Sequence, residues 1–360
     1  MSLAEWDFEL PPEQIARAPL ARRDACRLLV LPRDGGAPEH RVFADLRALL
    51  PAGALLVLNE TRVIPARLLG RRATGGKVEV LLVEPRPDGD WDALVRAGGA
   101  LRPPDEEVTL EPRAGGAADA APVRLRVVER LAPGRYRVRF PPDRPALEVA
   151  DALGHMPLPP YLGREDEPAD REAYQTVFAR EPGAIAAPTA GLHFTPELLA
   201  ALEAGGVEVA RLVLHVGLGT FAPVRAERLE EHVMHAERYA IPAATAGAVE
   251  AARRAGRPVV ACGTTTVRAL EAWARSGVAA GVTDIFIRPP WTLRAVDGII
   301  TNFHLPRTTL LALVAAFVGR ERLLAAYAEA IGAGYRFYSY GDAMLAWRAD
   351  GPPSTQEPSP

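Results

Sequence analysis

Polar and apolar positions alternate in short runs through the middle of the chain, from about residue 66 to residue 149. The runs are KVEVLLVE, WDALVRA, EVTLEP, VRLRVVER and RYRVRF, and Gly, Pro or Asp residues separate them. Several short strands at this spacing, without helical periodicity, are typical of a small antiparallel barrel or sandwich. The pattern therefore predicts a β domain over residues 66–149.

The segments on both sides of this region have a different pattern. RLLVL, FADLRALL and ALLVLNE read as strand, helix and strand, and helices and strands alternate from Tyr174 onward. One helix is well marked, because Thr195 suits the N-cap, Pro196 suits the first helical position and LLAALEA follows. Such alternation indicates a layered α/β domain. We predict an α/β fold, with a discontinuous layered α/β domain at 1–65 plus 150–348, an inserted small antiparallel β-barrel domain at 66–149 and a disordered tail at 349–360.

Composition narrows the class of protein. With 360 residues, the chain is long enough for two domains, and 48% hydrophobic with 24% charged residues is ordinary for a soluble enzyme. No apolar run reaches the length of a membrane span, and the acidic N-terminus does not resemble a secretory signal. Cys26 and Cys262 are too few for a thiolate-rich zinc site and suit a reducing compartment. These features predict a cytoplasmic protein.

The charge distribution leaves local nucleic-acid contacts open. The formal net charge of −3 excludes a uniformly basic surface, but affinity for nucleic acid comes from local phosphate contacts. One basic cluster precedes and enters the predicted β domain, and Lys77 within it is the single lysine of the chain. A solvated face and a phosphate-binding face are both compatible with this cluster. Its candidate phosphate-binding members are Arg67, Arg71, Arg72 and Lys77.

The segment PGAIAAPTAGLHFT, residues 182–195, is too rich in Gly, Pro and Thr to build a core. Gly permits close backbone approach and Pro fixes φ, so the segment can bring N–H groups and hydroxyls to a ligand. The helix that follows adds an N-terminus that favours anions. A tight structural connection is the alternative interpretation.

Other polar or Gly-rich turns follow apolar runs in the same way. In open α/β sheets, ligands bind outside the carboxyl ends of the strands, so several such turns predict a shared cleft. The turns lie in LVLHVGLGT, ACGTTTVRALE, TDIFI, GIITNFHLP and YSYGDAM. The candidate ligand-contacting residues from all these segments are Thr189, Gly191, His193, His215, Gly217, Glu237, Thr264, Thr265, Arg268, Asp284, Asn302, His304, Tyr340 and Asp342.

These segments together resemble one family. They are similar to the S-adenosylmethionine:tRNA ribosyltransferase-isomerases of queuosine biosynthesis. The resemblance covers roughly Asp7 to Leu345, and its further motifs include RRDACRLLVL, LLVLNETRVIPARLLG, GHMPLPPYL, EHVMHAE and VDGIITNFHLPRTTLLALVAAF. The motifs are long and occur in order, which makes chance similarity implausible.

The resemblance implies an unusual reaction. The ribosyl part of S-adenosylmethionine moves onto the aminomethyl group of a 7-deazaguanine at the wobble position of a tRNA. Adenine and methionine leave, and the ribose rearranges to give epoxyqueuosine. S-adenosylmethionine is then a co-substrate that the reaction consumes, so the resemblance implies no cofactor. It also implies that the partner is tRNA, that the protein does not associate with a membrane and that it is a monomer. Such a reaction needs a base, an acid and a pocket for a cationic donor from which water is excluded.

We assign provisional roles on this basis. The catalytic candidates are His193, His304, Glu237 and Asp342, and the remaining ligand-contacting residues are expected to bind substrate. His193 lies in a Gly-rich loop, where its removal is expected to leave little cavity. Arg268 is expected either to hold the methionine carboxylate or to pair with Glu271, three residues later on one helix. His215 is either a ligand contact or a buried structural imidazole. The expected tRNA contacts are Arg67, Arg71, Arg72 and Lys77.

Three other interpretations are possible. EHVMHAE places His232 and His235 near Glu237, but the spacing is not that of the HExxH zinc motif, so we predict no metal. An S-adenosylmethionine-dependent RNA methyltransferase would release S-adenosylhomocysteine in place of adenine, and no GxGxG-type turn follows the first strand. A non-catalytic tRNA-binding protein would bind tRNA without turnover, which the density of His, Asp and Thr in the later loops disfavours.

Overall fold

The computed structural model describes residues 2–112, 121–217 and 228–348. They form two compact units. The barrel unit comprises residues 62–175 and 182–187, and the sheet unit comprises residues 2–61, 176–181 and 188–348. The expected limits of the inserted domain, 66 and 149, lie inside the barrel unit, which also includes residues 150–175, expected to belong to the α/β domain. The expected tail, 349–360, lies outside the described residues.

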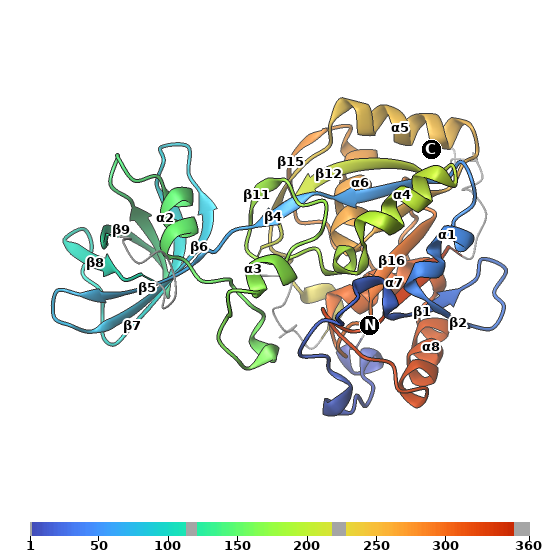
Figure 1. Cartoon of the computed structure of the whole chain (residues 1–360), viewed down its shortest axis with the longest axis horizontal. Helices are drawn as coiled ribbons and strands as arrows, with labels where there is room; N and C mark the ends of the chain where they lie inside the picture. Colours follow the sequence, from blue (N-terminus) through green and yellow to red (C-terminus); the bar gives the residue numbers. More distant parts are fainter. Residues whose placement is uncertain (1, 113–120, 218–227, 349–360) are drawn as a thin grey trace. The chain divides into compact units, whose positions relative to one another are not determined.

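The barrel unit contains a closed six-stranded barrel, as the alternating pattern predicts (Figure 1). Its strand order is β10-β7-β6-β5-β8-β9, and every pair is antiparallel. Alternate side chains such as Val78, Val108 and Leu125 fill its core. The helices of this unit are α2 (Ala146–Leu153) and α3 (Asp170–Ala173). The strands are β5 (Arg67–Arg72), β6 (Lys77–Pro85), β7 (Trp91–Ala97), β8 (Glu106–Leu110), β9 (Val123–Ala132) and β10 (Arg135–Arg139).

Strand β5 is not among the runs that the alternation predicts. Its sequence, RLLGRR, contains Gly70, which breaks the apolar period. A Cβ at this position would lie 2.5 Å from the backbone oxygen of Thr109 on β8. Glycine is therefore needed at this position, where β8 packs closely against β5. The same glycine interrupts the alternation of polar and apolar residues by which a strand is predicted.

The sheet unit is built on a nine-stranded mixed sheet with the order β15-β13-β12-β3-β14-β16-β17-β1-β2. Strands β12, β3, β14 and β16 are parallel, whereas β17 is antiparallel to β16 and parallel to β1. The strands are β1 (Arg27–Leu31), β2 (Glu39–Val42), β3 (Leu55–Asn59), β12 (Glu208–Leu214), β13 (Glu237–Ala240), β14 (Val259–Cys262), β15 (Ala280–Thr283), β16 (Gly298–Asn302) and β17 (Ala343–Trp347). A separate two-stranded sheet pairs β4 (Thr61–Val63) with β11 (Glu181–Ala184).

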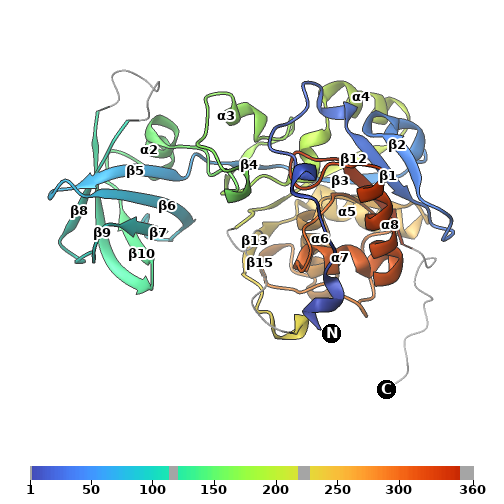
Figure 2. The ribbon, with the colours of Figure 1, turned by 90° about the horizontal axis from the view of Figure 1, so that it is seen from below.

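Helices cover both faces of the large sheet. Figure 2 shows α4 on one side and α5, α6 and α7 on the other. Leu56, Val260 and Ile300 point from successive parallel strands into the core under α4, together with Leu198 of that helix. The layered α/β domain predicted from the sequence is therefore confirmed. The helices are α1 (Leu46–Leu49), α4 (Pro196–Ala204), α5 (Ala243–Arg254), α6 (Thr264–Ser276), α7 (Thr309–Val318) and α8 (Arg320–Gly332).

Local signals place α4 correctly. Thr195 is its N-cap and accepts a hydrogen bond from the backbone N–H of Leu198, with Pro196 at the first helical position. FADLRALL, by contrast, forms only a 3-10 turn at Phe43–Asp45 and the single α-helical turn of α1. None of the described helices is long and apolar enough to cross a membrane.

Candidate functional site

The sequence-predicted residues of the sheet unit gather along one edge of its large sheet. Strands β3, β12, β14 and β16 are parallel and end at this edge, and β17 and β1 begin there. Asn302 ends β16 and pairs with Ala343, the first residue of β17. The turns after the strands therefore meet, as expected for an open α/β sheet.

A narrow cleft opens at this edge. It lies over the N-termini of α6 and α7 and the start of β13. Its apolar wall includes Phe286, and its polar wall includes Thr264, Thr265 and Arg268. Both helices are long enough for their N-terminal N–H groups to favour a negatively charged ligand group. The cleft is lined by His232, Met234, His235, Glu237, Thr264, Thr265, Arg268, Ile285, Phe286, Ile287, Thr309, Leu310 and Leu313.

A buried ion pair between Arg268 and Glu237 forms part of the cleft wall. Arg268 also donates to the backbone oxygens of Ile285 and Thr283, each at 3.3 Å. Glu237 accepts a hydrogen bond of 3.0 Å from the N–H of Gly217. The pair thus ties two backbone segments, at Gly217 and at residues 283–285, to the wall of the cleft.

The alternative expectation that Arg268 pairs with Glu271 is wrong. Glu271 is fully buried and pairs with Arg275. It also accepts hydrogen bonds from the backbone N–H groups of Arg294 and Ala295, at 2.9 and 2.8 Å. Arg268 therefore pairs with Glu237 on β13, whereas Glu271 pairs with Arg275 one turn later on α6, because the two side chains leave the helix toward different neighbours.

Asn59 is a buried polar residue of this edge that the sequence analysis did not single out. Its Nδ2 donates to the backbone oxygen of Leu214 at 2.9 Å and to Thr265 Oγ1 at 3.2 Å. Its Oδ1 accepts from the N–H groups of Thr61 and Leu214. The signal was present, because an Asn that follows the apolar run LLVL at a strand end is a candidate for polar contacts at that edge.

His215 lies next to this arrangement. Its Nδ1 is 2.9 Å from Thr61 Oγ1, and its ring is half-buried. Burial, with a smaller effect of nearby Arg238, lowers the pKa of His215 to about 4. Gly217, which follows, lies beside Glu237, and residues 218–220 of the same GLGT turn fall outside the described residues.

His193 and Asn302 form a buried network with Thr189. Thr189 Oγ1 donates to Asn302 Oδ1 at 2.9 Å, which turns Asn302 Nδ2 toward His193 Nε2 at 2.8 Å. The Nδ1 of His193 lies 3.2 Å from Cys26 Sγ. Burial, and secondarily Arg336 and Arg23, lower the pKa of His193 to about 3. A neutral imidazole in this network accepts at Nε2 and carries its proton on Nδ1.

The expectation that removal of His193 leaves little cavity is wrong. Only 4% of His193 is exposed, and its ring packs against Phe43 with 5.2 Å between centroids. A Gly-rich segment suggested an open loop, but the segment folds as a 3-10 helix, Thr189–His193, whose side chains face the core. Gly191 is required there for packing, since a Cβ would lie 2.7 Å from Phe178 Cζ.

His304 and Asp342 are also buried in hydrogen-bonded positions. His304 Nε2 is 2.9 Å from Thr301 Oγ1, and burial lowers the pKa of His304 to about 3. Asp342 accepts hydrogen bonds from the backbone N–H groups of Arg27 and Arg336, at 2.9 and 2.8 Å. The two carboxylate oxygens of Asp342 therefore link the backbone at Arg27 and at Arg336 to the start of β17.

The remaining predicted residues occupy two kinds of environment. Tyr340 is buried, with 3% of its surface exposed, whereas Asp284 is exposed beyond the end of β15. The four predicted tRNA contacts lie in the barrel unit, where Arg71 pairs with Glu111, Arg72 with Glu106, and Arg67 with both Glu79 and Glu165. Lys77 is exposed and has no ion-pair partner among the described residues.

The described part of the chain contains no group of three or more His, Cys, Asp or Glu side chains placed to hold a metal ion. His232, His235 and Glu237 line the cleft separately. Glu237 is committed to Arg268 and Gly217, which leaves the two imidazoles as the accessible titratable groups of the cleft wall. Partial burial and neighbouring His235 lower the pKa of His232 below its ordinary value.

Comparison with known proteins agrees with this arrangement. A curated relative from Moorella thermoacetica, named S-adenosylmethionine:tRNA ribosyltransferase-isomerase, is 52% identical over 355 residues, which are 96% of this chain and 99% of that protein. A relative of the same name from Geobacter sulfurreducens is 51% identical over 355 residues, with 96% and 99% covered. The crystal structure of an S-adenosylmethionine tRNA ribosyltransferase from Thermotoga maritima aligns with a TM-score of 0.53 and 37% identity, covering 95% of this chain and 99% of that one.

The sequence model of the family described as Queuosine biosynthesis protein matches residues 3–346. The barrel unit, the whole cleft and nearly all of the sheet unit fall within this match. The chain therefore belongs to the queuosine biosynthesis protein family.

Proposed function

We propose that this chain transfers the ribosyl moiety of S-adenosylmethionine onto 7-aminomethyl-7-deazaguanine at the wobble position of a tRNA, and isomerises it to give epoxyqueuosine-tRNA. Adenine and methionine are the other products. The observation that carries this proposal is the near full-length match to enzymes of this name, over a chain whose polar turns converge on one cleft. The proposed reaction uses S-adenosylmethionine as a consumed co-substrate, no metal and no other cofactor, in a cytoplasmic monomer.

The cleft offers complementary surfaces for the donor. S-adenosylmethionine carries a sulfonium, an amino acid group and an adenosine. The helix N-termini at Thr264 and Thr309 suit its carboxylate, and the hydroxyls of Thr264 and Thr265 suit ribose oxygens. Phe286 supplies an aromatic face for the sulfonium or the adenine. Glu237 and Arg268 keep this wall in place.

Proton transfer is assigned to His232. The base must remove a proton beside the sulfonium, so it must be neutral and reachable from the cleft. His232 lines the cleft, is only partly buried, and its pKa is lowered, which keeps the imidazole neutral at pH 7. His193 and His304 are neutral too, but their ring nitrogens are engaged by Asn302 and Thr301 within the core. We therefore assign His193 and His304 to positioning β16 and the loop after it.

Release of free adenine and methionine is the expected outcome when the protein is incubated with S-adenosylmethionine and tRNA bearing the aminomethyl base. Release is expected to depend on that tRNA and to persist in EDTA, because the described residues hold no metal cluster. Chromatography of the small products measures both. Loss of activity in EDTA with recovery by one metal would contradict the metal-free chemistry, and S-adenosylhomocysteine as main product would indicate methyl transfer.

His232→Gln is expected to lower turnover by about 100- to 10,000-fold, the usual contribution of a general acid or base. The melting temperature should stay unchanged, because His232 is only partly buried. In the wild type, turnover should fall at low pH as His232 becomes protonated, and this acidic limb should be absent from the residual activity of the variant. His40→Gln, on β2 and away from the cleft, is the control. An unchanged rate in His232→Gln would show that the base lies elsewhere.

Binding of tRNA is assigned to a row of exposed residues across the barrel. The strand registers place Lys77 of β6 beside Arg71 of β5, Arg71 beside Thr109 of β8, and Thr109 beside Arg124 of β9. All four are exposed. Arg71 shares its charge with Glu111, but neither Lys77 nor Arg124 has an ion-pair partner in the described barrel. Arg72 is less suited to phosphate, because its head is tied to the nearly buried Glu106.

Replacing Lys77 and Arg124 together by Gln is expected to weaken tRNA binding and to flatten its salt dependence. Removing one cation that binds a phosphate lowers the slope of log affinity against log salt by about 0.7 on single strands or about 0.9 on duplex. The slope of the double variant should therefore be smaller by about 1.4 to 1.8, with S-adenosylmethionine affinity unchanged. Arg130→Gln, at the far end of β9, is a matched control. An unchanged slope would place the tRNA-binding surface elsewhere.

A further inference from the structure

A hollow of the sheet unit lies at the edge of the sheet opposite the cleft. Pro51, Pro258 and Asp297 line it just before β3, β14 and β16 begin, and Val30 and Trp347 line it where β1 and β17 end. Its volume is about 490 Å³, which is within the range of small-molecule sites. Nothing in the proposed ribosyl transfer uses this hollow.

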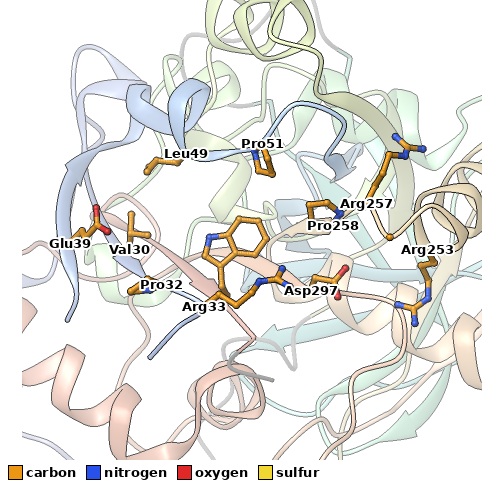
Figure 3. A pocket seen from close by; sticks show the side chains of 12 residues that line it. Val30, Pro32, Arg33, Glu39, Leu49, Pro51, Arg253, Arg257, Pro258 and Asp297 are labelled. Atoms are coloured by element: carbon orange, nitrogen blue, oxygen red, sulfur yellow. The ribbon is translucent and has the colours of Figure 1, made fainter. Parts of the chain in front are cut away.

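Charged side chains line it from two sides. Figure 3 shows Glu39 and Val30 on one side and Arg253 and Arg257 on the other. The two carboxylates of the lining are already engaged. Glu39 pairs with Arg41 at 2.6 Å, and Asp297 accepts a 3.0 Å hydrogen bond from the N–H of Val259 while it pairs with Arg348 at 3.4 Å. Among the described residues, neither carboxylate forms an ion pair with a cation of the hollow.

Two guanidinium groups of the lining have no ion-pair partner among the described residues. Arg257 pairs with Glu208 at 2.9 Å and donates to the backbone oxygen of Gly53. Within residues 2–112, 121–217 and 228–348, neither Arg33 nor Arg253 has a carboxylate partner, and both are exposed. The hollow thus combines a surplus of positive charge with room for a ligand, which favours an organic anion.

The wall of the hollow is planar and apolar beside these cations. The indole of Trp347 lies against Gly298 of the neighbouring strand, where a Cβ would come within 2.8 Å of the ring. Trp347 is half-buried and lies 5.2 Å from the guanidinium of Arg33, measured to the ring centroid. Leu49 and three prolines complete the apolar surface. An indole and an adjacent arginine are groups on which a nucleobase can stack.

The geometry points to a nucleotide site in this hollow, with the base on the Trp347 and Leu49 wall and the phosphate between Arg33 and Arg253. A planar base fits the indole, and a phosphate supplies the charge that two guanidinium groups need. Both a free nucleotide and a single-stranded nucleotide of RNA have this chemistry. The site is independent of the proposed ribosyl transfer, because it lies at the opposite edge of the sheet.

Isothermal titration of the full chain with AMP tests the proposal. AMP is expected to bind, whereas adenosine and inorganic phosphate should each bind at least about tenfold more weakly, because each lacks one half of the recognised ligand. Arg33→Gln combined with Arg253→Gln should weaken AMP binding by at least about tenfold. Arg254→Gln is the matched control, since Arg254 is the next residue on α5 but pairs with Glu250 and does not line the hollow.

Two competition experiments distinguish a free nucleotide from an RNA nucleotide, and the hollow from the cleft at the other edge of the sheet. AMP binding that a single-stranded oligonucleotide displaces would support an RNA nucleotide as occupant, and AMP binding unaffected by the oligonucleotide would support a free nucleotide. Three results would overturn the proposal. The first is that neither AMP nor the oligonucleotide binds. The second is that AMP binds equally well to the wild type and to the Arg33→Gln, Arg253→Gln double variant. The third is that S-adenosylmethionine displaces AMP, which would place AMP in the catalytic cleft.

Discussion

Arg268→Met is expected to lower turnover at least about 100-fold, the scale of loss that follows a small displacement of catalytic groups. It should also lower the free energy of unfolding by about 3–5 kcal/mol, the usual cost of leaving one member of a buried ion pair alone. The variant leaves the carboxylate of Glu237 buried without its cation, and the backbone oxygens of Thr283 and Ile285 without their donor. Urea unfolding and adenine release measure the two effects.

Two further variants separate stability from activity. Arg275→Met breaks the pair with Glu271 on the same helix but away from the cleft lining, so it should lose stability and retain turnover at low temperature. Arg268→Met combined with Glu237→Met removes both charges, so its loss of stability should be smaller than the sum of the two single losses, while turnover stays low. Turnover that recovers with stability in the double variant would show that the pair only holds the fold.

Stability is expected to fall by about 3 kcal/mol between pH 7.5 and pH 5.5 because of His193 and His304 alone. The pKa of each is lowered to about 3 in the folded state, against about 6.5 in the unfolded chain. The unfolded state therefore binds more protons between these values, so stability is fully present above pH 6.5 and is lost as pH falls toward 3. For each imidazole, the free energy of unfolding falls by about 1.4 kcal/mol for every pH unit below 6.5. Urea unfolding at several pH values measures the slope.

Removing the two imidazoles should flatten this dependence. In His193→Gln combined with His304→Gln, the loss of stability between pH 7.5 and 5.5 should shrink by most of that amount, although the variant starts less stable. His235→Gln is the control for replacing an exposed imidazole of the same unit. An equal slope in the wild type and the double variant would mean that His193 and His304 accept protons in the folded state, contrary to their burial.

Much of the fold can be predicted because its signals are local. Alternation in VRLRVVER is enough to indicate β9, whose first positions are alternately buried and exposed. The N-cap at Thr195 and Pro196 are enough to begin α4. Local rules fail where a neighbour that is distant in sequence determines the residue type. Gly70 is such a position, because the close approach of β8 requires a glycine there and this glycine interrupts the apolar period of β5. The barrel is therefore predictable as a class, but not strand by strand.

The site can be located from the sequence, but the contacts within it cannot. Polar turns after apolar strands predict the edge at which the cleft lies, since strand direction fixes where the turns meet. The partners of those residues come from far along the chain. Arg268 pairs with Glu237, 31 residues away, and His193 contacts Asn302, 109 residues away. Residue type marked His193 as a candidate acid or base, but only three-dimensional packing shows that its nitrogens are engaged in the core.

The fate of isotopic label from S-adenosylmethionine tests the central claim most directly. The protein would be incubated with tRNA bearing the aminomethyl base and with donor labelled either in the ribose or in the methyl group, and the tRNA nucleosides would be analysed by mass. We predict that ribose label enters the modified nucleoside and that methyl label remains with released methionine. Methyl label in the tRNA would contradict ribosyl transfer, and tRNA that binds but acquires neither label would contradict catalysis altogether.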